Sequence, residues 1–161
     1  LKEERDLPGD PRKLIEALAV RYGFPVKEGQ VTPHPYHDLG ASLASGSYPV
    51  DGMAIVPASM RTVAAVAAGL ELTLVDRAAA VTLKERRPLV IVPRETPVTR
   101  IQLENLLRLH DAGAVIVPAE PAFYQRPRTF EDLGDFMAAR VLEHLGLVPG
   151  RDLFPRWGVS E

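Results

Sequence analysis

The sequence predicts an α/β fold in which a parallel sheet is covered by helices on both faces. Three short runs of β-branched and aliphatic residues each lead into a proline, at 53–59, 89–95 and 114–120. Helical patterns alternate with these runs, and continuous apolar strands are typical of parallel sheets that are buried on both faces. We therefore expect a single three-layer α/β domain over residues 1–161.

The prolines mark the expected ends of the strands. Proline lacks the N–H that a sheet ladder requires, so the strands are expected to end at Pro57, Pro93 and Pro118. Right-handed crossovers would bring these three ends to one edge of the sheet. Ligands of open α/β sheets bind beyond the carboxyl ends of the strands, so the segments after the three prolines are expected to share one site.

The helices have recognisable start signals. Ser59 is expected to cap a helix over 63–70, Thr96 followed by Pro97 to start the next helix, and Thr129 to cap the last one. The residues expected on the inner faces of the last two helices are Leu103, Leu106, Leu107, Leu133, Met137, Val141 and Leu145.

The N-terminal part is expected to contain one helix and a long connection. Asp10 and Pro11 are typical of a helix start, and Gly23 is typical of a helix stop. The polar segment 29–52 follows, and a connection of this length in a compact domain is usually functional or mobile.

Composition excludes several classes of function. With 19 basic and 21 acidic side chains the chain has no global field for binding duplex nucleic acid. The absence of cysteine excludes disulfides, zinc–thiolate sites and cysteine nucleophiles. No apolar run reaches membrane-spanning length and no signal-peptide pattern opens the chain, so we expect a cytoplasmic protein. The four histidines lack metal-ligand spacing, so no metal site is expected.

Several side chains are candidates for binding an anion near the sheet edge. Arg94 and Glu95 directly follow the central strand, although a surface ion pair is an equally good interpretation. Arg140 lies beside the apolar face of its helix, where it either reaches solvent or meets an anion. Tyr124 belongs to a proline-bounded loop that is either a hydrophobic plug or a phosphate donor.

Two further groups are open to a structural and a functional interpretation. Ser59 and Thr62 are either plain helix caps or hydroxyls that contact a phosphate or the edge of a flavin. Lys84, Arg86 and Arg87 are expected at a solvated helix end, with at most one of them pointing inward. Taken together, Lys84, Arg94, Tyr124 and Arg140 would suit a tightly held phosphate without a metal.

Five segments resemble one known family closely. The segments are GASLASGS, PASMRTVAAVAAG, RAAAVTLKERRPLVIVPRETP, LENLLRLHDAGAVIVPAEPAFYQRP and LFPRWG, and together they run from about Gly40 to the C-terminus. They are similar to the UbiX-type flavin prenyltransferases, formerly described as aromatic acid decarboxylases. The combination of LKERRPLVIVPRETP with PAFY is highly specific for this family.

The resemblance implies a fold, a reaction and partners. It implies a Rossmann-like or flavodoxin-like subunit of a homo-oligomer, a dodecamer, with active sites at subunit contacts and with the tail 147–161 packed on a neighbouring subunit. It implies transfer of a dimethylallyl group from dimethylallyl monophosphate to N5 and C6 of reduced FMN, without a metal. The product, prenylated FMN, would serve a UbiD-type decarboxylase in pathways such as ubiquinone biosynthesis. The resemblance implies neither a nucleic-acid partner nor a membrane partner.

The resemblance also implies roles for individual residues. The residues matching the FMN-binding segment are Ser59, Met60, Arg61 and Thr62, with Arg94 contacting both flavin and substrate. Those matching the substrate site are Ala44, Ser45 and Gly46 around the prenyl group, Lys84, Glu95, Tyr124 and Arg140 at the phosphate, and Trp157 in the C-terminal segment. The implied catalytic groups are Glu95, Lys84 and Arg94, together with a proton-transferring glutamate that corresponds to Glu3 or Glu4, of which Glu4 is favoured.

The chain departs from the family pattern in two respects. Ala80, Gln102 and Leu106 replace other residues in two helical motifs, where we expect effects on packing or subunit contacts. The sequence contains no counterpart of the family's first strand or of its Gly-Ser-Gly-Ala type loop for the flavin phosphate. Two alternatives are an FMN-dependent decarboxylase, whose known relatives use a cysteine that this chain lacks, and a non-catalytic FMN-binding subunit.

Overall fold

The computed structural model describes residues 11–23, 29–149 and 153–154. The chain divides into two compact units, 1–35 and 36–161, so the expected single domain remains a prediction. The first unit contains helix α1 (Pro11–Tyr22), which is followed by Gly23 at a φ of +67°, as expected for a glycine that stops a helix. Asp10, the expected start residue, lies outside the described residues.

The second unit is an α/β domain with a parallel three-stranded sheet in the order β1-β2-β3. This confirms the predicted fold class. Its strands are β1 (Met53–Ala58), β2 (Leu89–Pro93) and β3 (Val115–Ile116). Its α-helices are α2 (Met60–Ala67), α3 (Leu74–Lys84), α4 (Arg100–Asp111) and α5 (Phe130–His144), and two short 3₁₀ helices, η2 (Ser42–Ala44) and η3 (Phe123–Gln125), lie in the loops.

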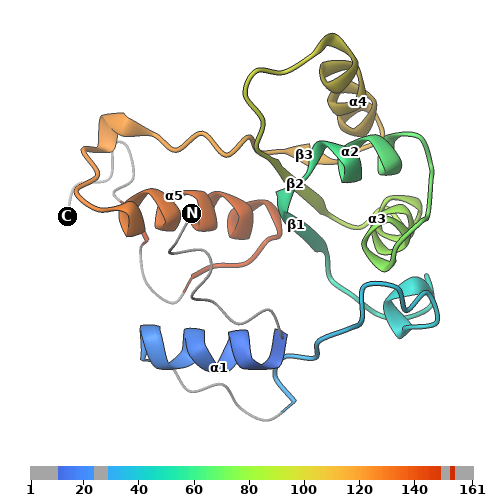
Figure 1. Ribbon diagram of the computed structural model, residues 1–161, viewed down its shortest axis with the longest axis horizontal. Helices are drawn as coiled ribbons and strands as arrows, with labels where there is room; N and C mark the ends of the chain where they lie inside the picture. Colours follow the sequence, from blue (N-terminus) through green and yellow to red (C-terminus); the bar gives the residue numbers. More distant parts are fainter. Residues whose placement is uncertain (1–10, 24–28, 150–152, 155–161) are drawn as a thin grey trace. The chain divides into compact units, whose positions relative to one another are not determined.

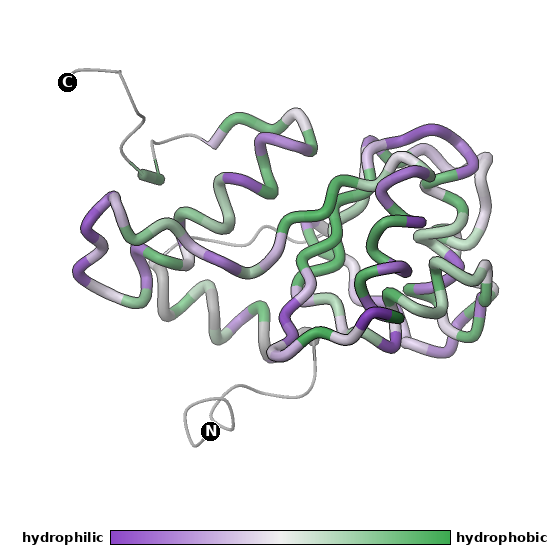
Figure 2. Tube along the Cα trace, turned by 90° about the horizontal axis from the view of Figure 1, so that it is seen from above, coloured by the Kyte–Doolittle hydropathy of each residue, from purple (hydrophilic) through white to green (hydrophobic). Residues whose placement is uncertain are grey.

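Helices cover both faces of the sheet, as Figure 1 shows. On one face, Ile55 and Ile91 of the sheet form a core with residues of α2, α3 and α4, including Val63, Ala79 and Leu109. On the other face, the core contains Val90, Val92 and Val141, the last of these from α5. Figure 2 shows hydrophobic strands in the centre of this unit with hydrophilic stretches in the helices and loops around them.

The central strand β2 is buried along its whole length, which confirms its prediction from a continuous apolar run. Its Val90 pairs with Ala54 of β1 on one side and with Val115 of β3 on the other. Among the described residues, β1 pairs with β2 alone, so it is an edge strand of the described sheet. Val56, near the end of β1, is accordingly 58% exposed.

The prediction that every strand ends at its proline is correct for β2 alone. The strand β1 continues through Pro57 to Ala58, which an edge strand tolerates because the missing N–H need not face a partner. The strand β3 ends at Ile116, yet the N–H groups of Val117 and Ala119 still donate to β2 carbonyls, at 2.9 Å and 3.0 Å. Pro118 therefore interrupts the ladder without turning the chain away from the sheet.

The predicted start of α4 was wrong by three residues. The helix begins at Arg100 with Thr99 as its cap, because Thr99 and Gln102 form a reciprocal capping box that Thr96 does not form. The inward face also differs from the prediction. Leu106 and Leu109 contact the core, whereas Leu103 and Leu107 are 52% and 58% exposed.

The other two predicted caps are confirmed. The Ser59 side chain accepts a hydrogen bond from the Thr62 N–H at the start of α2, and Thr129 forms a capping box with Asp132 at the start of α5. In α5, Val141 is buried and Met137 and Leu145 pack against the same core, as the helical spacing predicts. These caps fix where the segments after β1 and η3 enter their helices.

Candidate active site

A cleft of about 240 Å³ lies beyond the carboxyl ends of β2 and β3. Arg94 and Glu95 enter it directly after β2, Glu120 enters it shortly after β3, and Met60 lines it from the first turn of α2. The remaining lining residues are Pro93, Thr96, Val98, Leu103, Leu106, Pro118 and Ala119. The segments after all three strands therefore meet at one site, as the strand pattern predicts.

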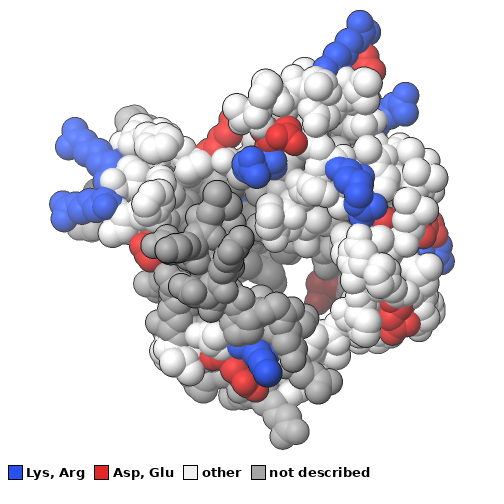
Figure 3. All heavy atoms as spheres, in the orientation of Figure 1, with Lys and Arg blue, Asp and Glu red and all other residues white. Residues whose placement is uncertain are grey.

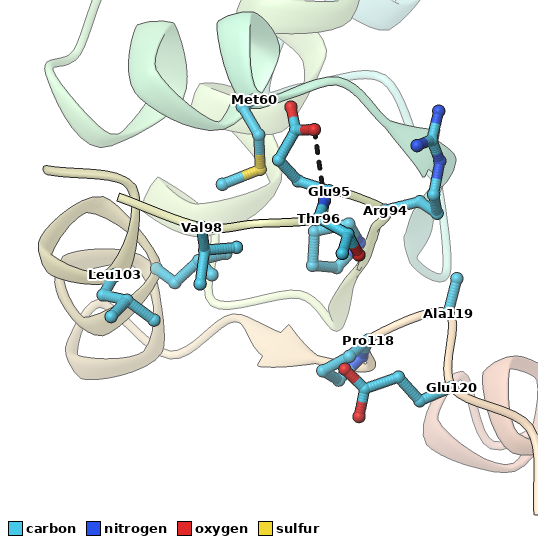
Figure 4. Close-up of a pocket in the computed structure, with 11 residues that line it drawn as sticks. Met60, Arg94, Glu95, Thr96, Val98, Leu103, Pro118, Ala119 and Glu120 are labelled. Atoms are coloured by element: carbon cyan, nitrogen blue, oxygen red, sulfur yellow. Dashed lines mark hydrogen bonds between the residues drawn. The ribbon is translucent and has the colours of Figure 1, made fainter. Parts of the chain in front are cut away.

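The cleft combines an apolar wall with charged groups at its mouth. Met60, Val98 and Leu103 form much of the apolar side. The Glu95 carboxylate accepts a hydrogen bond from the backbone N–H of Thr96 at 3.2 Å. The Arg94 side chain points away from the Glu95 carboxylate in Figure 4. Such a cleft suits a flat aromatic ligand with polar edges.

Sequence reasoning missed Glu120 as a lining residue. The rule that selected Arg94 and Glu95, namely their position directly after a strand, also applies to Glu120, which follows Pro118 by two residues. Thr96 was also assigned to the wrong place, because it lines the cleft and does not start the next helix. Both errors concern the short loops at the carboxyl edge of the sheet.

The segment 59–62 forms the first turn of α2 beside this cleft. The hydroxyls of Ser59 and Thr62 lie 3.0 Å apart and hydrogen-bond to each other, and the Ser59 hydroxyl also caps the helix by accepting from the Thr62 N–H. The N–H groups of a helix's first turn have no partners within the helix and carry a partial positive charge. This turn is therefore able to offer donors to an acceptor in the cleft.

Arg61 belongs to a polar cluster that the sequence did not indicate. Its guanidinium donates a hydrogen bond to the Tyr36 hydroxyl at 2.7 Å and lies 3.8 Å from the carboxylate of Asp76. Asp76 is completely buried in the first turn of α3. Its backbone N–H donates to the capping Thr73 hydroxyl, at 3.3 Å, which fixes the start of α3.

A second group of predicted site residues lies at the end of α3. Lys84 forms an ion pair with Glu85 beside Gly46, and this hydrogen bond and charge lower the pKa of Glu85. A Cβ atom at Gly46 would stand 2.5 Å from the Lys84 Nζ and would also meet the Glu85 carboxylate, so the Gly46 backbone lies close to the ends of these two side chains. Ser45, in the same loop, shares a hydroxyl hydrogen bond with Ser47 at 2.9 Å.

Tyr124 and Arg140 occupy a third region. Tyr124 lies on η3 with its side chain 67% exposed. Arg140 lies on α5, where it forms an ion pair with Glu143, and its guanidinium approaches the His144 ring at 3.4 Å. Arg140 thus has intrahelical partners, which is the structural alternative that its position in the sequence left open.

A single chain does not gather all the predicted phosphate donors. Lys84 precedes β2 and Arg94 follows it, so the two residues lie at opposite ends of this strand. Arg140 belongs to α5, which packs on the sheet face opposite to α3. The pocket expected from Lys84, Arg94, Tyr124 and Arg140 therefore remains a prediction that requires more than one copy of the chain.

Two predicted residues, Glu4 and Trp157, lie outside the described residues. Within the described ranges no cluster of His, Asp or Glu is arranged to hold a metal ion. The helices in those ranges are all too short or too polar to cross a membrane. On the face shown in Figure 3, the described basic and acidic side chains are scattered and form no single basic surface.

Comparison with known proteins identifies the family. A family model described as Flavoprotein matches residues 28–142. Flavin prenyltransferase UbiX of Halalkalibacterium halodurans is 45% identical over 157 residues, which cover 98% of this chain and 73% of that protein. The Pseudomonas aeruginosa enzyme of the same name is 47% identical over 94% of this chain and 71% of its own length. The chain belongs to the UbiX family of flavin prenyltransferases.

Solved structures of the UbiX family have the same fold. A crystal structure of AnUbiX in complex with FMN and dimethylallyl pyrophosphate is 41% identical, with a TM-score of 0.77 over 92% of this chain and 80% of that one. A dodecameric FMN-dependent UbiX-like decarboxylase from Escherichia coli is 40% identical, with a TM-score of 0.79 over 97% of this chain and 77% of that one. The flavodoxin-like assignment of the second unit is thereby confirmed.

Proposed function

We propose that this chain is the subunit of a flavin prenyltransferase that moves a dimethylallyl group from dimethylallyl monophosphate to N5 and C6 of reduced FMN. The observation that carries the proposal is the cleft beyond β2 and β3, in a chain of the UbiX family, with Arg94 and Glu95 at its mouth. The AnUbiX structure, whose ligands are FMN and dimethylallyl pyrophosphate, supports the same pair of ligand classes.

The cleft residues fit the ring system of FMN. The apolar side formed by Met60, Val98 and Leu103 suits the face of an isoalloxazine ring. The first turn of α2, with Ser59 and Thr62, supplies donors for the polar ring edge, and the Arg94 guanidinium supplies a charge that favours an anionic flavin. When bound, reduced FMN supplies the electron-rich N5 and C6 atoms that accept the prenyl group.

Cationic side chains stabilise the departing phosphate. When the bond between the allylic carbon and the phosphate oxygen breaks, negative charge grows on the oxygen and positive charge on the prenyl carbons. Donors fixed on the phosphate side therefore favour the transition state more than the bound substrate. In the proposed site, Lys84, Arg94, Tyr124 and Arg140 serve as these donors, so no metal ion is required.

More than one copy of the chain builds this site. Lys84 and the loop 44–46 lie near the amino ends of the strands and form one half-site, whereas Arg94 and Glu95 lie beyond the carboxyl ends and form the other. The two half-sites meet when the amino ends of the strands in one subunit face the carboxyl ends in another, which is a heterologous contact that closed assemblies produce. The dodecameric state of the Escherichia coli neighbour supports a homo-oligomer of this kind.

Glu95 is the proposed proton-transfer group. Its carboxylate stands at the cleft mouth, where its hydrogen bond to the Thr96 N–H holds it in one orientation. There it is able to accept the proton that leaves the flavin C6 position or to pass a proton to the departing phosphate. Glu4 and Trp157 keep the roles that the family resemblance implies, in proton transfer and in closing the pocket, and a UbiD-type decarboxylase is the proposed recipient of the product.

Anaerobic turnover tests the proposal. The assembled protein is incubated with reduced FMN and dimethylallyl monophosphate, and the flavin is then analysed by mass spectrometry. A flavin heavier by one prenyl unit is the expected result. An unmodified flavin that nevertheless copurifies with the protein would favour a non-catalytic FMN-binding subunit instead.

A further inference from the structure

The loop before β1 is held by two arginines, Arg77 in α3 and Arg87 just after it, whose side chains donate to backbone carbonyls of the loop. Arg87 donates from one guanidinium nitrogen to the Gly46 carbonyl at 2.9 Å and from the other to the Tyr48 carbonyl at 3.1 Å. Arg77, near the start of α3, donates from its Nε to the Ala44 carbonyl at 3.0 Å. These bonds connect segments that lie 33 to 41 residues apart in the sequence.

The end of α3 directs Arg87 toward the loop. Arg86 has a φ of +57°, its N–H donates to the Leu83 carbonyl, and the Arg87 N–H donates to the Thr82 carbonyl at 3.0 Å. This pair of bonds is the Schellman arrangement, in which a residue in the left-handed conformation ends the helix and reverses the chain. As a result Arg86 is exposed, while its neighbour Arg87 is half-buried against the loop.

Arginine suits this position better than other cations. Two carbonyls separated by one residue require two donors in a fixed relation, which the planar guanidinium provides and an ammonium group does not. Within the loop, Ser45 and Tyr48 make short-range backbone bonds, to Ser42 and Ser45, which shape the loop but do not hold it to the rest of the unit. The arginine bonds therefore set where the loop stands relative to Lys84.

Gly46 shows how close the loop lies to Lys84. A Cβ atom there would stand 2.5 Å from the Lys84 Nζ, so the Gly46 backbone lies beside the Lys84 ammonium. A loop in this position forms a wall beside Lys84, the side chain in this region that is proposed to bind the substrate phosphate. A movement of the wall would enlarge the space next to that phosphate.

We propose that Arg87 is a positioning residue that holds the backbone of 44–46 as a rigid wall and thereby limits the length of the prenyl chain that the enzyme accepts. The inference rests on the proposed function, in which this loop lines the prenyl pocket. Arg87 acts through the Gly46 and Tyr48 carbonyls and need not touch the substrate. Loss of its two bonds would let the loop move outward and admit a longer isoprenoid.

A competition between two substrates tests this inference. Arg87→Gln and the matched variant Arg86→Gln each remove one positive charge at adjacent positions, and only the first removes the loop bonds. Each assembled protein receives reduced FMN with equal amounts of dimethylallyl and geranyl monophosphate, and the two products are counted by mass spectrometry. The product ratio does not depend on the fraction of protein that is folded.

Arg87→Gln is expected to lower the dimethylallyl-to-geranyl product ratio by about tenfold, the effect of two weakly net-stabilising hydrogen bonds, while Arg86→Gln keeps the wild-type ratio. Arg87→Lys, which retains one donor, is expected to fall between them and serves if Arg87→Gln fails to fold. Equal ratios in the Arg87 variants and the wild type would overturn the inference. A wild-type protein that prenylates no flavin would instead overturn the proposed function.

Discussion

The guanidinium of Arg61 lies 3.8 Å from the carboxylate of Asp76, whose side chain is completely buried. Neither Asp76 oxygen has a hydrogen-bond partner among the described residues, so Arg61 is the charge that faces this carboxylate. A buried carboxylate without a partner is costly, because it has lost its hydration. Arg61 also holds the Tyr36 hydroxyl, so the cluster connects the starts of α2 and α3 to the segment before η2.

Arg61→Met is expected to lower the free energy of unfolding by about 1–3 kcal/mol, because it leaves the Asp76 carboxylate buried and unpaired. Asp76→Asn is expected to cost less, since a neutral amide of the same shape needs no counter-charge. The double variant should recover part of the loss caused by Arg61→Met. Urea unfolding of all four proteins gives the coupling energy, and strictly additive losses would contradict the pairing.

Glu95→Gln is expected to slow prenyl transfer by about 100-fold, the usual contribution of a positioned acid or base, with FMN binding unchanged. Glu120→Gln is the matched control, since Glu120 lines the same cleft after the neighbouring strand and has no proposed role in the reaction. Single-turnover rates by mass spectrometry and FMN titration by fluorescence separate the two effects. Equal slowing in both variants would assign the effect to the charge of the cleft and not to Glu95.

Arg140→Ala is expected to raise the KM for dimethylallyl monophosphate by about tenfold or more, because a charge-assisted bond to phosphate is lost, and to leave the FMN dissociation constant unchanged. Glu143→Gln removes the charge that pairs with Arg140 but keeps the arginine and its neighbour His144. If Arg140 served only the helix, both variants would act alike through stability. A raised KM in Arg140→Ala alone identifies the phosphate role, and an equal loss of FMN affinity would speak against it.

The sequence predicts the elements of this domain well where local signals are strong. The apolar run 89–93 becomes the buried central strand, and Ser59 and Thr129 cap helices because an N-cap needs only its own first turn. It predicts less well where competing signals lie close together. Thr96 with Pro97 is a plausible helix start, but the helix begins after Thr99, because Thr99 and Gln102 form the reciprocal capping box.

The residues of the candidate site were likewise predictable from local signals and not from contacts between distant parts of the sequence. The position of Arg94 and Glu95 in the cleft follows from strand order alone, so the sequence sufficed. The contacts of Arg87 with Gly46 and of Arg61 with Asp76 join residues 41 and 15 positions apart, and no periodicity reports such pairs. The motif also does not reveal that Lys84 and Arg94 are far apart in space. They are ten residues apart in the sequence, and the strand between them places them at its opposite ends.

Asp132 makes the start of α5 sensitive to pH. Hydrogen bonds from the N–H groups of Arg128 and Thr129 lower the pKa of its carboxyl. A carboxyl whose pKa is lower in the folded state stabilises the fold at pH values above its unfolded pKa of about 4, and this contribution disappears as the pH falls through the folded pKa. Asp132→Asn is therefore expected to lower Tm at pH 7 and to cost progressively less below pH 4.

The capping box of α4 is the control for this pH effect. Thr99 and Gln102 make the same reciprocal bonds, but glutamine does not titrate. Gln102→Ala is expected to lower Tm by a similar amount at pH 7 and at pH 3. Thermal unfolding followed by circular dichroism across this range decides the matter, and a constant deficit in Asp132→Asn would show that its charge is irrelevant to the cap.

Mixed assemblies of two inactive variants test whether the site is shared between subunits. Lys84→Ala and Arg94→Ala are each expected to be inactive alone, since each removes one half of the phosphate site from every position in the oligomer. If Lys84 and Arg94 come from different copies, a random equal mixture restores both side chains at about a quarter of the sites, because each contributing copy is intact there half of the time. Coexpressed variants should therefore regain about a quarter of the wild-type turnover, whereas a site built within one chain would stay inactive in the mixture.

Coexpression of Lys84→Ala with Glu85→Ala is the control. These neighbours belong to the same half-site, so every copy in the mixture carries one of the two substitutions in that half-site. Any gain above the simple average of these two homo-oligomers would contradict the assignment of the half-sites.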